Sequence, residues 1–321
     1  MPINEQIAAT IAGLGVLAQC DHDISPLTTY KVGGRAAIFV RAETMQDLSL
    51  VARVVCETGV PMIPLGRGSN VLMSDHGFAG LIVQLGEVAQ QILLPRAEVS
   101  DEMQDGVAVA CSVTAGSAVA LPVLARRTAA VGIRGFEWAV GVPGSLGGAI
   151  RMNAGGHGSD ISESLVSAQV LDFRTGEIAT VLTPEFGLRF RASDIEDQQL
   201  IISGTLSLTY GSSQESLQMI DDIVRWRREN QPGGQNAGSV FVNPVPGEIT
   251  AGQLIDRCGL RGFRIGTAEV SIKHANFIQA DMGGSAQDVV TLMRHIQRVV
   301  GDTSGYELRS EIRLIGFEEE S

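Results

Sequence analysis

Two glycine-rich stretches contain the residues best suited to hold a ligand through the main chain. One is PLGRGSN at 64–70, and the other is GVPGSLGGAIRMNAGG at 141–156. In turns of this kind consecutive N–H groups can face one concavity and hold a phosphate, and glycine leaves no side chain between backbone and ligand. The first stretch is followed by VLMSD, which is not a convincing helix, so the Rossmann fingerprint is absent, as is the P-loop. Together the stretches favour a bound dinucleotide, with a tight turn and a close-packed crossover as alternatives.

Four polar residues stand where side-chain chemistry is possible, and each also has an ordinary structural interpretation. Ser239 follows a glycine in GSVFVNP, which is not the G-x-S-x-G elbow of a nucleophilic serine, and a lone loop serine is more often a turn residue. Arg191, in FRASD, follows strand-like residues and could form a surface salt bridge. Glu311 alternates with apolar residues in LRSEIRLIG, which is typical of an exposed strand carboxylate. His274, in IKHANF, fits a core position and a ligand-binding position equally well.

Composition narrows the class of protein. The chain has 321 residues, 44% of them hydrophobic, which is enough for a packed core and for two or three domains. The formal net charge is −12 at pH 7, so the chain repels phosphate backbones overall and is not expected to bind nucleic acid. Local amides and single arginines can still hold a small anion.

Cysteine and histidine spacing predicts no metal site and no disulfide framework. The cysteines at 20, 56, 111 and 258 are scattered without a C-x-x-C pair, and no histidine has metal-like spacing from Cys, Asp or Glu. No Lys or Arg precedes Lys31, and no apolar run is long enough to cross a bilayer. We therefore predict a cytoplasmic protein with free thiols and without membrane insertion.

Alternating strand and helix patterns follow an amphipathic N-terminal helix. The first region predicts a helix over 47–59 and strands over 36–42, 61–65 and 80–85. The second predicts a helix over 118–132 and strands over 106–113, 167–173, 177–182 and 199–210. The last third predicts a loop at 230–238, helices over 216–230, 251–259 and 285–301, and strands near 268–271, 275–280 and 307–316. We place domain boundaries near residues 90 and 212, which gives domains 1–90, 91–212 and 213–321.

These stretches occur together in the order found in one enzyme family. The chain resembles the UDP-N-acetylenolpyruvoylglucosamine reductases (MurB) from about residue 25 to residue 317, and it is similar to their shorter type, without an extra tyrosine-bearing loop. The motifs that carry the resemblance are TTYKVGGRA (28–36), PLGRGSNVL (64–72), GVPGSLGGAIRMNAG (141–155), FRAS (190–193), RREN-QP (227–232), AGSVFVNP (237–244), LIDRCGLRG (254–262), AEVSIKHANF (268–277) and SEIRLIG (310–316).

The resemblance implies an α+β fold. Two subdomains would hold FAD as in the vanillyl-alcohol-oxidase/p-cresol-methylhydroxylase flavoproteins, and a C-terminal α+β domain would bind the substrate. The glycine stretches would then wrap the FAD pyrophosphate with main-chain amides. No Cys or His falls where a covalent flavin link is expected, so the FAD should be non-covalent. The implied FAD-binding residues are Gly66, Arg67, Gly68, Ser69, Asn70, Gly144, Ser145, Gly147, Gly148, Asn153 and Ala154.

The implied reaction is the reduction of UDP-N-acetylglucosamine enolpyruvate to UDP-N-acetylmuramate, in peptidoglycan synthesis, with NADPH as hydride donor. Negative charge develops beside the substrate carboxylate and must be stabilised there, and the α-carbon must receive a proton. Three positions match the family's catalytic residues. Arg191 would bind the carboxylate, Ser239 would be the general acid, and Glu311 would orient the carboxylate or hold Arg191.

Other positions match substrate-binding residues or depart from the family pattern. The implied contacts to the UDP-sugar are Asn243, His274, Arg227, Arg228 and Tyr30. The departures are Val242 for a common Lys, Phe190 for Tyr, Gly156-His157 for Ala-Tyr, Arg257 for Gln and Ser310 for Pro. None of them replaces a predicted catalytic residue.

Two other functions remain open at this point. One is an FAD-dependent oxidase of the same flavin fold, which the missing covalent tether and the three matched catalytic residues disfavour. The other is a flavin-free, non-catalytic relative, which the missing lysine at Val242 favours. In every case the sequence indicates small-molecule ligands, no metal and no obligate protein partner.

Overall fold

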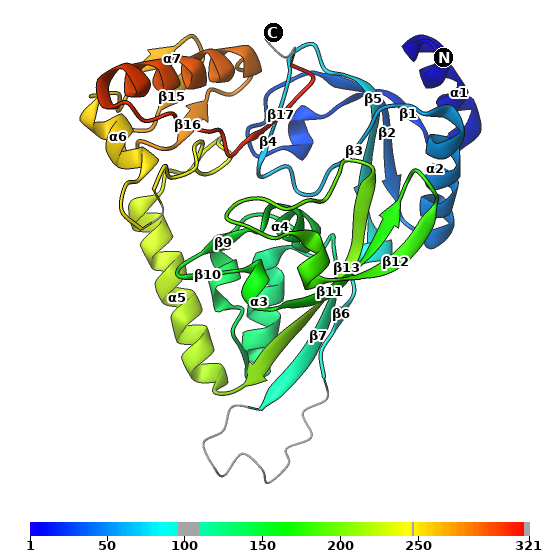
Figure 1. Ribbon diagram of the computed structural model, residues 1–321, viewed down its shortest axis with the longest axis horizontal. Helices are drawn as coiled ribbons and strands as arrows, with labels where there is room; N and C mark the ends of the chain where they lie inside the picture. The colour runs from blue at the N-terminus through cyan, green and yellow to red at the C-terminus, as the bar shows by residue number, and fades with distance from the viewer. Residues whose placement is uncertain (96–108, 246, 318–321) are drawn as a thin grey trace. The chain divides into compact units, whose positions relative to one another are not determined.

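The computed structural model describes residues 1–95, 109–245 and 247–317 (Figure 1). The chain forms two compact units, each assembled from separate segments. The first unit contains Met1–Ala18, Val40–Arg67 and Ile82–Arg227, and the second contains Gln19–Phe39, Gly68–Leu81 and Arg228–Ser321.

This division differs from the predicted boundaries near residues 90 and 212. Strands β2 (Arg35–Ala42) and β5 (Phe78–Leu85) each continue from one unit into the other, so no single cut near residue 90 separates the units. Helix α5 (Ser213–Asn230) belongs to the first unit up to Arg227, because Ile220 and Ile223 are buried in that unit's core. The second boundary therefore lies 15 residues beyond residue 212, at residue 227.

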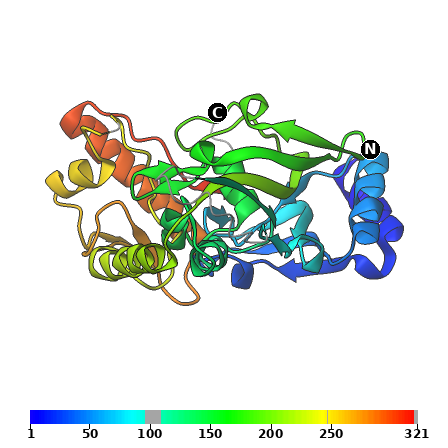
Figure 2. The ribbon, with the colours of Figure 1, turned by 90° about the horizontal axis from the view of Figure 1, so that it is seen from below.

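The N-terminal part builds a small α/β layer. Its four-stranded sheet has the order β1-β2-β5-β3, with β1 at Gln19–Asp23 and β3 at Met62–Pro64. Helices α1 (Ile3–Leu14) and α2 (Met45–Thr58) lie side by side in both views (Figures 1 and 2). Helix α2 starts at a capping box between Thr44 and Asp47 and ends at Gly59, which has a left-handed φ of 64°.

The first unit is built on an antiparallel sheet of order β12-β11-β13-β7-β6, to which β8 adds by pairing with β13. Apolar residues such as Val113, Ala115, Leu206 and Leu208 are buried on one face, where they pack with α3 (Leu121–Ala130) and α4 (Leu146–Met152). Because side chains alternate along a strand, Thr114 and Thr205 fall on the opposite face. The strands are β6 (Ile92–Leu93), β7 (Ala110–Gly116), β8 (Ile133–Arg134), β11 (Leu165–Asp172), β12 (Glu177–Leu182) and β13 (Gln199–Tyr210).

The second unit has its own core around two helices. Helix α7 (Ala286–Ser304) begins with Ser285, whose hydroxyl caps the Asp288 N–H, and it packs against α6 (Ala251–Arg257) and a three-stranded sheet of order β14-β15-β16. A parallel pair joins β4 (Val71–Met73) to β17 (Arg313–Ile315). The sheet strands are β14 (Arg264–Ile265), β15 (Ala268–Val270) and β16 (Ile278–Ala280).

The predicted α+β class is confirmed, with local differences. Helix α4 lies inside the glycine-rich stretch, where we predicted only a turn, and strands β1 and β4 were not predicted. The final strand covers only Arg313–Ile315 of the predicted 307–316, and Leu314 remains 38% exposed. Residues 106–108 of the predicted strand 106–113 lie outside the described residues. No helix in the described ranges has the length and hydropathy needed to cross a membrane.

Candidate active site

The loop at residues 66–70 presents main-chain donors. The carbonyl of Gly66 accepts from Gln84 Nε2 at 2.9 Å, and that of Gly68 accepts from the Thr29 N–H at 3.1 Å. The N–H groups of Arg67, Gly68 and Ser69 donate to no acceptor in the described part of the chain. With the Gly66 and Gly68 carbonyls engaged and these amides open, the loop suits an anion. Gly68 is required here, since its φ is 61° and an added Cβ would lie 2.3 Å from the Leu27 carbonyl oxygen.

The second glycine stretch adjoins the start of this loop within the first unit. A Cβ at Gly66 would lie 2.6 Å from Ser145 Oγ, and Arg67 Nε donates to the Pro143 carbonyl at 3.3 Å. Two of the stretch's amides are already used, because Leu146 donates to the Val119 carbonyl and Gly147 to the Ser117 carbonyl. This corrects the prediction for Gly147, one of the residues expected to turn main-chain amides to the pyrophosphate, because its N–H is used within the protein.

The glycines of this stretch also differ in their surroundings. Gly147 is packed against protein, since an added Cβ would lie 2.8 Å from Ser117 Cβ, whereas one at Gly148 would meet nothing closer than Ser145 Oγ at 3.7 Å. Gly148 therefore has the open space that a ligand-facing glycine needs, as does Gly156, where an added Cβ would meet nothing within 4 Å. The open amides of residues 67–69 suit the pyrophosphate of FAD. In the first unit, the space at Gly148 leaves its main chain open to a ligand.

Two other predicted FAD contacts have protein partners instead. Asn153 is 3% exposed, and its carboxamide donates to Asp160 Oδ2 and to the Arg189 carbonyl and accepts from the Ser162 N–H. Ala154 donates to the Ala149 carbonyl and accepts from Ile161. This corrects the prediction that the Asn153 side chain offers a donor and an acceptor to a ligand.

Arg191 lies on a tight turn of the first unit. Arg189 and Ala192 exchange reciprocal main-chain hydrogen bonds of 3.0 Å, and Arg191 between them has a left-handed φ of 55°. Its guanidinium donates to the carbonyls of Asn153 and Gly155. Its Cζ lies 5.1 Å from the ring centroid of Phe190, so the ring retained at this position contacts the cation.

The two arginines at the end of α5 have different surroundings. Arg227 is half-buried in the first unit, and burial lowers the pKa of its guanidinium. Next to it, Trp226 packs edge-on against His157, and burial together with the Arg227 charge lowers the pKa of that imidazole. Arg228 is exposed and belongs to the second unit, where its carbonyl accepts from Lys273 Nζ.

In the second unit, the segment that follows Ser239 is held by hydrogen bonds to a buried asparagine, Asn276. Asn276 is 4% exposed, and its Oδ1 accepts from the Phe241 N–H at 3.0 Å while its Nδ2 donates to the Phe241 carbonyl at 2.8 Å. The Asn276 carbonyl also accepts from the Val240 N–H at 2.9 Å. Sequence reasoning missed Asn276, although an amide between the apolar residues of HANFI was a signal for a buried polar contact.

Replacing Asn276 with alanine is expected to lower the free energy of unfolding by about 1–3 kcal/mol, because the Phe241 N–H and carbonyl lose their partners while buried. Urea unfolding measures the loss. Asn276→Asp keeps the acceptor and loses the donor, so its stability should lie between those of Asn276→Ala and the wild type. Equal stability of all three proteins would contradict a stabilising role for the hydrogen bonds between Asn276 and Phe241.

A polar pocket of about 290 Å³ opens beside this segment. Three of the predicted residues line it, namely Ser239, Asn243 and His274. Asp256 and Arg261 line it as well, joined by hydrogen bonds of 2.6 and 3.1 Å, and were not predicted. Asn243 is anchored through its Oδ1, which accepts from the Ala251 N–H at 3.1 Å. Val242 is buried and is not among the lining residues, so the valine at this position belongs to the core.

Burial in this pocket disfavours the charged form of His274. Its Nδ1 accepts from the Asn276 N–H, and burial, with a smaller contribution from the Arg261 charge, lowers the pKa of the imidazole. The folded state therefore binds fewer protons than the unfolded state just below the ordinary pKa of 6.5, and stability is lost as the pH falls through this window.

We therefore expect the free energy of unfolding in urea to be lower at pH 5.5 than at pH 7.5, and His274→Gln to reduce this difference. Part of the difference should remain, since the pKa of His157 is lowered in the same direction. Carboxylates such as Asp75 contribute at lower pH, because their pKa values lie below 3.8. An unchanged pH difference in His274→Gln would contradict this assignment.

Glu311 and Tyr30 also belong to the second unit. The Glu311 N–H donates to the Val240 carbonyl at 2.8 Å, so the main chain at Glu311 is bonded to the residue after Ser239. The Glu311 carbonyl accepts from Asn70 Nδ2 at 2.9 Å, which ties it to the first glycine loop. Tyr30 is fully buried in this unit's core, so it does not form a pocket wall as a predicted substrate contact should.

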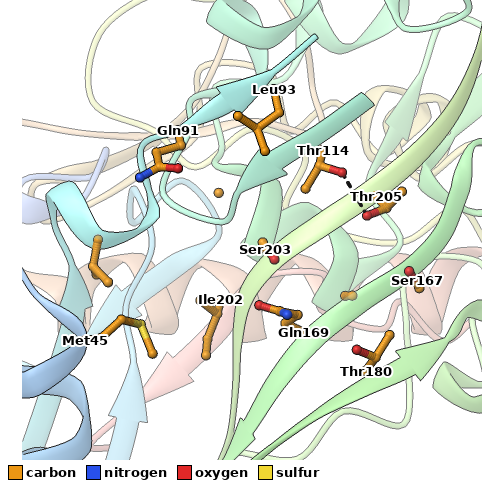
Figure 3. Close-up of a pocket in the computed structure, with 13 residues that line it drawn as sticks. Met45, Gln91, Leu93, Thr114, Ser167, Gln169, Thr180, Ile202, Ser203 and Thr205 are labelled. Carbon is orange, nitrogen blue, oxygen red and sulfur yellow. Dashed lines mark hydrogen bonds between the residues drawn. The ribbon is translucent and has the colours of Figure 1, made fainter. Parts of the chain in front are cut away.

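A larger cavity, of about 370 Å³, lies on the polar face of the first unit's sheet (Figure 3). The hydroxyls of Thr114 and Thr205 point toward one another there and share a hydrogen bond of 3.1 Å. The described lining contains no charged side chain and none of the predicted site residues. It is therefore poorly suited to a ligand that carries phosphates and a carboxylate.

Two family models match the chain. The C-terminal domain of UDP-N-acetylenolpyruvoylglucosamine reductase matches residues 230–315, which include Ser239 and Glu311. An FAD binding domain matches residues 36–182, which include both glycine stretches. The fit of the loop amides to a pyrophosphate and this match agree that the chain binds FAD.

Curated relatives cover nearly the whole chain. The UDP-N-acetylenolpyruvoylglucosamine reductase of Anoxybacillus flavithermus is 35% identical over 292 residues, which are 90% of this chain and 91% of the relative. That of Gloeobacter violaceus is 39% identical over 294 residues, covering 90% and 93%. The crystal structure of the Thermus caldophilus enzyme (MurB) matches with a TM-score of 0.76 and 29% identity, over 93% of this chain and 99% of that one. The chain is an FAD-dependent oxidoreductase and belongs to the UDP-N-acetylenolpyruvoylglucosamine reductase family.

Proposed function

We propose that this protein reduces UDP-N-acetylglucosamine enolpyruvate to UDP-N-acetylmuramate with NADPH as hydride donor, in peptidoglycan synthesis. The observation that carries the proposal is the pocket in which Ser239, the expected proton donor, lies with Asn243 and His274. The same pocket contains Arg261, whose charge is paired with Asp256. A hydroxyl among hydrogen-bonding groups of this kind suits a substrate that carries phosphates and must accept a proton. The names of the relatives support the choice of substrate.

FAD, when bound, supplies hydride transfer between NADPH and the enolpyruvyl ether. It would be held non-covalently, with its pyrophosphate at the amides of residues 67–69. Because these donors are neutral main-chain groups, an acidic chain can hold an anion without a cluster of basic side chains.

Arg191 would bind the substrate carboxylate. Hydride addition to the terminal carbon of the vinyl ether leaves an electron pair at the α-carbon, and this charge spreads into the carboxylate. A guanidinium held by main-chain carbonyls stabilises that charge without reorganising during the reaction. The left-handed φ of Arg191 fits this role, since backbone strain of this kind clusters at functional sites.

Ser239 would donate the proton to the α-carbon, which completes the reduction. A hydroxyl is a weak acid, but a carbanion is a strong base, so the driving force for proton transfer is large. Glu311 would orient the substrate carboxylate, and Arg227 and Arg228 would contact the phosphates of the UDP-sugar.

A cytoplasmic location remains a prediction, which the four free cysteines support.

The test is an anaerobic visible spectrum of the purified protein, first with NADPH and then with UDP-N-acetylglucosamine enolpyruvate. The proposal expects the flavin band to bleach with NADPH and to return with the substrate. A band that returns only with air would support an oxidase and overturn the proposed substrate. A protein that shows no flavin band after reconstitution with FAD would be a non-catalytic relative.

A further inference from the structure

Asn153 ends helix α4 in a conformation that few residues adopt. Its φ is 40° and its ψ 56°, in the left-handed region that asparagine tolerates better than other non-glycine residues. The side chain is 3% exposed. It makes three hydrogen bonds, from Nδ2 to Asp160 Oδ2 at 3.2 Å, from Nδ2 to the Arg189 carbonyl at 3.3 Å, and to Oδ1 from the Ser162 N–H at 3.0 Å.

Two of the groups that Asn153 contacts belong to the segment that carries Arg191. The Arg189 carbonyl, which accepts from Asn153 Nδ2, also accepts the Ala192 N–H that closes the tight turn. The main-chain carbonyl of Asn153 accepts from Arg191 Nη1 at 3.3 Å, and that of Gly155 accepts from Nη2 at 2.7 Å. One residue therefore contacts both the backbone that presents Arg191 and the guanidinium itself.

The carbonyl at Gly155 is fixed by the same network. Strands β9 (Gly155–Gly156) and β10 (Ser159–Asp160) form a short hairpin in which Gly155 pairs with Asp160. A Cβ at Gly155 would lie 2.5 Å from Asp160 Cβ, so the two strands meet closely at this pair. Asp160 is the residue to which Asn153 Nδ2 donates. Asn153 thereby holds the hairpin whose first carbonyl binds Arg191.

We propose that Asn153 is a positioning residue for Arg191, with its carboxamide setting the turn at Arg189–Ala192 and the hairpin at Gly155–Asp160 that together hold the guanidinium. The inference rests on the role assigned to Arg191 in the proposed function. It also explains why the residue is an asparagine. The site needs a donor to two oxygens and an acceptor for one N–H, which a carboxamide supplies and a carboxylate does not.

Asn153→Gly is the informative variant, because glycine keeps the left-handed backbone and removes only the carboxamide. Misplacing a catalytic group by about 1 Å can cost about 10²-fold in rate. We expect Asn153→Gly to lower kcat about that much, with NADPH bleaching of the flavin unchanged. Ser159→Ala, which removes a hydroxyl of the same hairpin that donates to Glu163 Oε2 at 2.7 Å, is the control that should retain wild-type kcat. Asn153→Asp should behave like Asn153→Gly, since its carboxylate cannot donate.

A double-mutant cycle separates positioning from general stability. If Asn153 acts through Arg191, adding Asn153→Gly to Arg191→Lys should change kcat far less than it does in the wild type. Fully additive effects on kcat would overturn the inference, as would wild-type kcat in Asn153→Gly.

A readout that is independent of turnover keeps the inference separate from the proposed function. Phenylglyoxal labelling, followed by peptide mass spectrometry of the FAD-loaded protein, measures how accessible each guanidinium is. Asn153→Gly should speed labelling of Arg191 several-fold and leave exposed Arg189 unchanged. Equal labelling of Arg191 in both proteins would overturn the inference. A wild-type flavin that NADPH bleaches and the UDP-sugar does not restore would instead overturn the proposed function.

Discussion

Replacing Ser239 with alanine is expected to lower kcat by about 10²–10⁴-fold, the range that one general acid contributes. The bleaching of the flavin band by NADPH should be unaffected, because that half of the reaction needs no proton from Ser239. Folding should also be unaffected, since the adjoining segment is held through Val240 and Phe241 by Asn276 and not through the serine hydroxyl. Stopped-flow spectra of the two half-reactions separate these effects.

The matched control for this variant is Ser304→Ala, near the end of α7 in the same unit. The Ser304 hydroxyl donates to the Val300 carbonyl, and the residue does not line the polar pocket. It should retain wild-type turnover. If Ser239→Ala also turned over at the wild-type rate, Ser239 would not be the acid, and another pocket residue such as His274 would be the next to replace.

Replacing Arg191 with lysine is expected to lower kcat by about 10²–10³-fold, comparable with the loss of one preorganised donor to a developing anion. Lysine keeps the positive charge, but its ammonium group cannot pair two parallel N–H donors with a carboxylate. It also cannot reproduce the two contacts to the Asn153 and Gly155 carbonyls with the same geometry. Steady-state kinetics with varied UDP-sugar should show a raised KM together with the lowered kcat.

Arg189→Lys is the control, because it makes the same change two residues away. Arg189 pairs at the surface with Asp194, and both side chains are more than half exposed. An exposed pair of this kind contributes little to stability, so kcat and KM should stay near the wild-type values. Similar kinetic losses in both variants would indicate damage to the turn as a whole and would contradict a specific role for the Arg191 guanidinium.

Much of this protein was predictable from the order of its motifs and from local periodicity. Apolar alternation and capping residues predicted β2, α2, β13 and α7 close to their observed bounds, because each buries one face of its own segment. The two glycine stretches indicated a dinucleotide, and the full set of motifs indicated FAD and the reductase family. These features depend on short stretches of chain, so they are visible without the fold.

Only the tertiary structure decided how those stretches are used. Helix α4 forms within a glycine-rich sequence of low helix propensity, because its first amides bond to the carbonyls of Val119 and Ser117 on a neighbouring segment. Strands β2 and β5 each pass from one unit into the other. Composition could not predict this, because no linker-like segment stands at the boundary. Asn153 and Asn276 have roles set by partners 36 and 35 residues away, at Arg189 and Phe241. A carboxamide can serve a ligand or the main chain, and which of these it does depends on groups that only folding brings within hydrogen-bonding distance.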